Sequence, residues 1–152
     1  MKKSNGKGFE PIPNMRCEYC GAPVVRKSAD GIYRENSRGV ELYVCSNYPR
    51  CDAYVRVEPN TGKPVGTLAN ARLRKLRSEA HKSFDRLHLS GLMSKNEAYA
   101  WLAALLQAPM KQAHIGYLGE YYCQVVIDES RRLLSAHRLR TDSASFRGGA
   151  LA

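Results

Sequence analysis

The stretch YVCSNYPRCDAYV, residues 43–55, decides the fold, because it holds two cysteines, Cys45 and Cys51, around a proline-containing turn. A second pair, Cys17 and Cys20, opens the segment CEYCGAPVVRK. In a Cys-x-x-Cys knuckle two thiolates bind one ion, and Gly21 follows the pair where a left-handed backbone is often required. The two pairs therefore predict a tetrahedral site for one zinc ion.

Short β-rich runs, such as VVR, ELYV and AYVRV, lie between and beside the two pairs, as in a zinc ribbon. An iron–sulfur cluster uses the same ligand type, and four unrelated buried cysteines are a further alternative. Zinc is favoured over both. A segment of this size with few large aliphatic residues can hardly fold without a metal ion that cross-links its two cysteine pairs. We therefore expect the zinc to be structural.

The segments CEYCGAPVVRK and YVCSNYPRCDAYV resemble the four-cysteine zinc ribbons at the C-terminus of bacterial type IA topoisomerases. The resemblance covers Cys17 to Val57, and Cys-Ser-Asn-Tyr-Pro-Arg-Cys is its most distinctive part. Two features depart from that family: Glu18 stands where it has proline, and the central segment, residues 29–44, is longer. The topoisomerase catalytic domains are absent from this sequence. The resemblance implies a ribbon that grips single-stranded DNA with aromatic and basic side chains.

The second half of the chain resembles small uncharacterised bacterial and phage proteins that carry such a ribbon ahead of a helical region. This likeness implies a phage or mobile-element origin.

The composition predicts an α+β protein, with a small N-terminal β-rich zinc ribbon followed by a helical domain of about three helices. We expect a flexible segment at residues 1–15, the ribbon at 16–58, a linker at 59–66, the helical domain at 67–138 and a disordered tail at 139–152.

Apolar residues recur at intervals of three and four in the helical half, which predicts helices over residues 70–89, 94–108 and 118–136. Ser94 and Glu97 form a capping-box pattern at the start of the second helix. The fifth cysteine, Cys123, lies at the edge of the third helix's apolar side, and we interpret it as a core residue rather than a metal ligand.

The chain has 152 residues and carries 24 Lys and Arg against 14 Asp and Glu, a formal charge of +10. A basic chain of this size indicates a nucleic-acid partner, although a charged surface that only keeps the protein in solution is an open alternative. Bases stack on exposed aromatic rings while cations follow the phosphates. On the ribbon, the tyrosines that could serve are Tyr19, Tyr33, Tyr43, Tyr48 and Tyr54, interleaved with Arg26, Lys27, Arg34, Arg50 and Arg56.

Tyr48 and Arg50 are the favoured contacts, because they lie at the tip of a metal-fixed turn. Strand alternation places Tyr54 and Arg56 on one face. The first helix offers a second basic surface, formed by Arg74, Lys75, Lys82 and Arg86. We expect DNA rather than RNA, and single strands rather than duplex.

No enzyme is expected. The four histidines, His81, His88, His114 and His137, do not form a catalytic set, and no phosphate loop or nucleophile elbow occurs. A closed all-cysteine site also has no open coordination position. We expect no small-molecule substrate.

The competing hypothesis is an interaction module that docks on a host protein of nucleic-acid metabolism. No stretch has the roughly 20 apolar residues of a membrane helix, and the basic start lacks the apolar run of a signal peptide. We therefore expect no membrane partner and a cytoplasmic location in a bacterial or infected cell.

Overall fold

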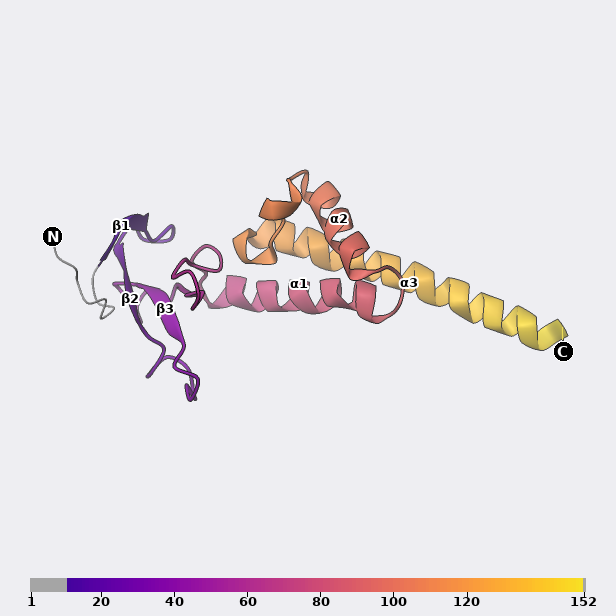
Figure 1. Cartoon of the computed structure of the whole chain (residues 1–152), viewed down its shortest axis with the longest axis horizontal. Coiled ribbons are helices and arrows are strands. Elements are labelled where there is room, and N and C mark those ends of the chain that lie inside the picture. Colours follow the sequence, from indigo (N-terminus) through magenta and orange to yellow (C-terminus); the bar gives the residue numbers. More distant parts are fainter. Residues whose placement is uncertain (1–10, 152) are drawn as a thin grey trace. The chain divides into compact units, whose positions relative to one another are not determined.

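The computed structural model describes residues 11–151, with side chains described between Met15 and Thr141. It divides the chain into two compact units, residues 1–74 and 75–152. A four-stranded sheet forms the first unit and helices form the second, which confirms the predicted α+β class (Figure 1).

The sheet of the first unit is antiparallel, with the strands in sequence order. Its strands are β1 (Pro11–Arg16), β2 (Pro23–Ser28), β3 (Glu41–Cys45) and β4 (Tyr54–Arg56). The register pairs Leu42 with Lys27 of β2 and with Arg56 of β4, and pairs Val44 with Val25 and Tyr54. Directly opposed residues share a face, so this register assigns each side chain of the ribbon to one side of the sheet.

Both faces of the sheet carry buried side chains, because the pleat sends alternate residues to opposite sides. On one face Val24, Tyr43, Cys45 and Val55 form an apolar cluster. On the other face Leu42 and Val44 are buried under half-exposed residues of the loop and turns. The small core is thus split into two layers on either side of one thin sheet.

The segment expected to be a linker returns to the ribbon sheet. Val57 bridges to Pro64, and Tyr54 bridges to Ala69. Leu68 is 4% exposed and belongs to the ribbon's apolar cluster. Residues 57–69 therefore add to the ribbon core. The predicted ribbon ended earlier, at residue 58.

Within residues 70–151, three helices and two single-turn 3₁₀ helices are described. Their bounds are α1 (Ala71–Leu89), α2 (Lys95–Leu106), η1 (Met110–Gln112), η2 (Ile115–Tyr117) and α3 (Glu120–Leu151). The predicted capping box is confirmed: the Ser94 hydroxyl accepts from the Glu97 N–H at 3.1 Å, and the Ser94 N–H donates to the Glu97 carboxylate at 2.8 Å.

The core of the helical unit centres on Phe84 of α1, which is 2% exposed. Its ring meets Tyr99 edge-on at 5.1 Å between centroids and lies 6.4 Å from the Trp101 ring, both from α2. Cys123 is fully buried, as the sequence predicts, and its Sγ lies 3.9 Å from the Leu118 carbonyl oxygen.

The two ends of the chain differ from the expectation. Residues 11–15, expected to be flexible, belong to β1, and the rest of that segment, 1–10, lies outside the described residues. Helix α3 continues to Leu151, through residues expected to form a disordered tail. The tail is polar, but it has no proline, and no glycine before Gly148, so nothing interrupts the helical hydrogen bonds earlier.

Among the described residues, none of the helices combines the length and the apolar character that a membrane-spanning segment needs.

Candidate metal centre and tyrosine face

Two turns bring the four predicted ligands together at one end of the sheet. Cys17 and Cys20 follow β1, Cys45 ends β3 and Cys51 precedes β4. Their four sulfur atoms all lie within 4.8 Å of one another. The Sγ atoms of Cys17 and Cys51 are 3.6 Å apart, and those of Cys20 and Cys45 are 3.4 Å apart.

These distances fit one tetrahedral zinc ion. A zinc–sulfur bond of about 2.3 Å in tetrahedral geometry places the sulfurs about 3.8 Å apart. Disulfide sulfurs would be about 2.05 Å apart, and all four cysteines are free. The donor set therefore holds a single structural zinc ion with four thiolates.

Backbone hydrogen bonds shape both turns. In the first turn the Gly21 N–H donates to the Cys17 carbonyl at 2.8 Å, and Gly21 takes a φ of 78°, as the sequence predicts. In the second turn the Cys51 N–H donates to the Asn47 carbonyl at 3.1 Å. The Tyr48–Pro49 peptide in this turn is cis.

Asn47 supports the site from outside the ligand set. Its backbone N–H donates to the Cys45 Sγ, and its side-chain amide donates to the Cys20 Sγ, both at 3.4 Å. Such outer partners orient metal ligands and stabilise their charged form. The position of Asn47, two residues after Cys45, is a sequence signal for the bond from its backbone N–H to the Cys45 Sγ. The second bond crosses to the other cysteine pair and has no sequence signal.

The surroundings shift the pKa values of Cys20 and Cys45 in opposite directions, and burial also raises the pKa of Cys51. Hydrogen bonding, first from the Ala22 backbone and then from the Asn47 side chain, lowers the pKa of Cys20 to about 7. Burial raises the pKa of Cys45 to about 12. Bound zinc overrides these shifts, because a coordinating thiol is deprotonated outright.

The sheet and its four-thiolate centre define a zinc-binding protein of the zinc-finger class. The model of the zinc-finger-containing domain family matches residues 13–133, and the chain belongs to this family. Neither a curated protein nor a solved structure matches the chain.

Three tyrosines gather on the sheet face that carries Leu42 and Val44. The ring centroids of Tyr33 and Tyr48 lie 6.3 Å and 6.4 Å from that of Tyr54, and all three side chains are half-buried. The register places two basic residues on the same face, opposite Leu42. We call this surface the tyrosine face; its members are Tyr33, Tyr48, Tyr54, Lys27 and Arg56.

Arg74 belongs to the ribbon unit, and its side chain binds other groups of that unit. Its guanidinium lies 3.8 Å from the Tyr54 ring centroid and donates to the carbonyl oxygens of Asp52 and Ala69 at 2.7 Å and 2.6 Å. It therefore covers one side of the Tyr54 ring. Arg74 is the one residue of the predicted basic surface on α1 whose guanidinium is shown bound to groups of the ribbon unit.

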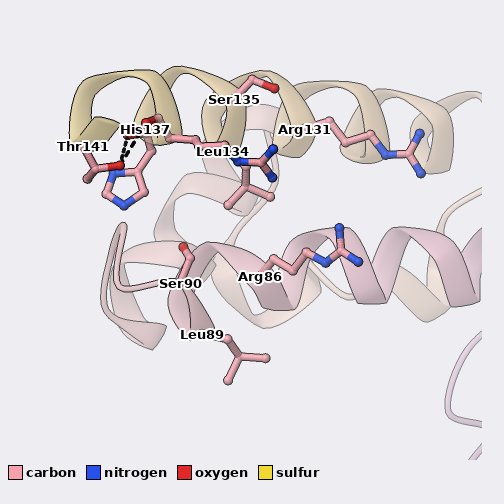
Figure 2. Close-up of a pocket in the computed structure, with 9 residues that line it drawn as sticks. Arg86, Leu89, Ser90, Arg131, Leu134, Ser135, His137 and Thr141 are labelled. Carbon is pink, nitrogen blue, oxygen red and sulfur yellow. Dashed lines mark hydrogen bonds between the residues drawn. The ribbon is translucent and has the colours of Figure 1, made fainter. Parts of the chain in front are cut away.

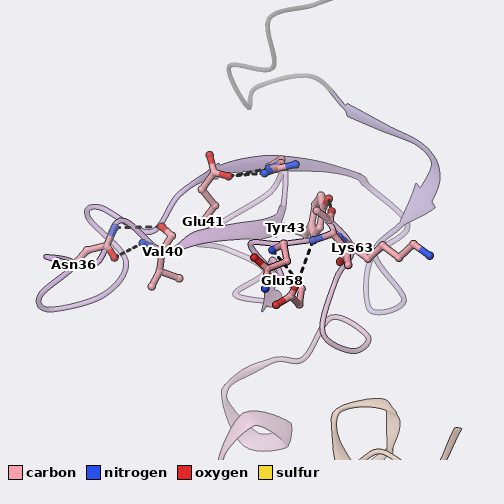
Figure 3. A network of polar contacts seen from close by, with 10 residues as sticks. Asn36, Val40, Glu41, Tyr43, Glu58 and Lys63 are labelled. Carbon is pink, nitrogen blue, oxygen red and sulfur yellow. Dashed lines mark hydrogen bonds and ion pairs between the residues drawn. The ribbon is translucent and has the colours of Figure 1, made fainter. Parts of the chain in front are cut away.

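Arg26 lies on the sheet face opposite to its neighbour Lys27. Its guanidinium donates to the Glu41 carboxylate at 2.6 Å and 3.0 Å, and it lies 6.0 Å from the Tyr43 ring centroid. Tyr43 is 5% exposed, and its hydroxyl donates to the Gly62 carbonyl. Figure 3 shows Glu41 and Tyr43 in this polar network, close to Glu58 and Lys63. Both Arg26 and Tyr43 thus contribute to ribbon structure.

The remaining candidates lie in the two cysteine turns, in the loop between β2 and β3, and along α1. Arg50 is exposed in the zinc-site turn, and Arg34 is exposed in the loop between β2 and β3. Tyr19 is 44% exposed, and its hydroxyl accepts from the Asn70 N–H at 3.3 Å. Lys75, Lys82 and Arg86 are exposed along α1 in the helical unit.

Proposed function

We propose that the ribbon binds single-stranded nucleic acid, DNA in preference to RNA, through the tyrosine face and the neighbouring Arg50. The observation that carries this proposal is the clustering of three partly exposed tyrosine rings beside two cations on one side of a zinc-fixed sheet. Aromatic rings that stack on bases next to cations that follow phosphates are the usual elements of a single-strand site.

The formal charge of +10 supports a polyanionic partner. The four thiolates occupy every position of a tetrahedral zinc ion, so the metal has no free position for a substrate. We therefore propose a binding protein rather than an enzyme. Its phage or mobile-element origin stays a prediction from resemblance.

The test measures binding of a fluorescently labelled oligo(dT) to the full chain at several salt concentrations. Tyr48→Leu keeps an apolar side chain against Leu42 and Val44 but removes the ring, so we expect a loss of about 1–3 kcal/mol. Tyr48→Phe keeps the ring and should bind like the wild type. If Tyr48→Leu is folded and also binds like the wild type, Tyr48 is not a contact.

Arg50→Ala and Arg56→Ala should each lower the slope of log affinity against log salt by about 0.7, as expected for one phosphate contact on a single strand. Arg26→Ala is the matched control, because Arg26 lies on the other face and pairs with Glu41. An equal effect of Arg26→Ala would contradict the assignment to the tyrosine face. An oligo(rU) arm compared with oligo(dU) tests the preference for DNA, since the 2′-hydroxyl separates the two.

If the wild type binds no oligonucleotide at low salt, the nucleic-acid proposal fails. The alternative is then a module that docks on a host protein. Capture of one protein from lysate, unchanged by nuclease, would support that alternative.

A further inference from the structure

The helical unit contains a basic groove between the end of α1 and the middle of α3 (Figure 2). It has a volume of about 780 Å³ and is open to solvent. Three arginines from two helices line it, together with a histidine and two leucines: Arg86, Arg131, Arg138, His137, Leu89 and Leu134. Among the described residues that line this groove there is no carboxylate.

The three guanidinium groups are available to a ligand. Arg86, Arg131 and Arg138 are all exposed. The carboxylate of Glu129, two residues before Arg131, is paired with Arg132 at 2.9 Å. Asp128 accepts a hydrogen bond from Gln124 at 3.0 Å. The two acidic residues that precede Arg131 on α3 are thus engaged by other side chains.

The arginines are spaced for a chain of phosphates. Arg131 and Arg138 are seven residues apart, so they lie about 20° from each other around α3 and about 10 Å apart along it. That spacing exceeds the width of one phosphate group. Arginine is permanently charged, and its planar fork matches phosphate oxygens.

We propose that this groove binds the sugar–phosphate backbone of a nucleic-acid strand, as a second contact surface separate from the ribbon. The inference rests on the proposed nucleic-acid function and extends it to the helical unit. Arg131 and Arg138 contact successive phosphates from α3, and Arg86 contacts the strand from α1. Contacts between arginine and phosphate carry no sequence information, so these three contacts contribute affinity without base preference.

The experiment uses the full zinc-loaded chain and labelled oligo(dT), oligo(dA) and oligo(dC). The double variant Arg131→Ala/Arg138→Ala should lower the slope of log affinity against log salt by about 1.4 on all three probes, at about 0.7 per contact. Arg86→Ala should lower it by about 0.7. Arg140→Ala is the matched control, since Arg140 lies about 180° around α3 from Arg131 and does not line the groove.

A second double variant, Arg131→Lys/Arg138→Lys, separates charge from folding. It should keep the wild-type slope, because lysine also contacts phosphate as a point charge. If it behaves like the alanine variant, or if Arg140→Ala has an equal effect, the groove is not a phosphate site.

The outcomes distinguish this inference from the proposed function. If groove variants bind like the wild type while Tyr48→Leu weakens binding, the groove inference is overturned and the ribbon proposal stands. If groove variants lose slope while tyrosine-face variants do not, the groove stands and the ribbon contact is overturned. Absence of wild-type binding overturns both.

Discussion

Asn47 contacts one cysteine of each pair, and it does so with two different groups, its backbone N–H and its side-chain amide. Only the amide contact is lost when the side chain is changed. A substitution of Asn47 therefore measures what this hydrogen bond adds to zinc affinity, because the four cysteine ligands stay unchanged.

Asn47→Ala should therefore weaken zinc binding by about 10–100-fold while the four thiolates remain. A competition titration with a fluorescent zinc chelator measures the change. Asn60→Ala is the control, since Asn60 is an exposed asparagine of the same unit. Its backbone N–H donates to Glu58 rather than to a cysteine sulfur. Equal zinc affinity of Asn47→Ala and the wild type would show that the amide has no role at the site.

Helix α2 is the element whose start is best explained by its sequence. Ser94 and Glu97 exchange two hydrogen bonds at its N-terminus. Ser94→Ala removes an acceptor for the Glu97 N–H and should lower the free energy of unfolding of the helical unit by about 0.5–2 kcal/mol. Ser78→Ala, at an exposed position inside α1, should not destabilise the protein, because alanine is the better helix former. Urea unfolding followed by circular dichroism compares the two.

Packing between α1 and α2 depends on Phe84. Phe84→Ala should cost about 3–5 kcal/mol, because it opens a cavity against Tyr99 and Trp101. Leu89→Ala is the control within the same helix, since Leu89 is 74% exposed. A midpoint of urea unfolding that shifts equally in both variants would contradict the core assignment.

For the whole molecule, the two compact units should respond differently to loss of the metal. Cys51→Ser removes one of four ligands, so we expect zinc content to fall and the ribbon to lose its structure, while most of the helical circular dichroism remains. Cys123→Ser is the control, because Cys123 is buried in the helical unit and should leave the zinc content unchanged. Loss of all helical signal in Cys51→Ser would show that the helical unit cannot fold without the ribbon.

The sequence by itself determined the parts that depend on short-range chemistry. Cysteine spacing identified the four ligands, and Ser94 with Glu97 identified the start of α2, because each pattern operates within a few residues. The order of a β-rich half and a helical half followed in the same way from local composition. Helix ends were less predictable. Composition alone predicted a disordered tail from residue 139, whereas α3 continues to Leu151.

Only the tertiary structure decided which distant residues meet. The strand register places Lys27 and Arg56 on the same face, on either side of Leu42, and Arg74 lies over the Tyr54 ring twenty residues before it. The groove joins Arg86 to Arg131, two arginines that no local pattern connects. These contacts depend on pairing between strands and on packing between helices, and neither is encoded in the spacing of nearby residues. The cysteines could be assigned from the sequence because a metal ion demands a fixed ligand set, whereas a basic surface imposes no such spacing.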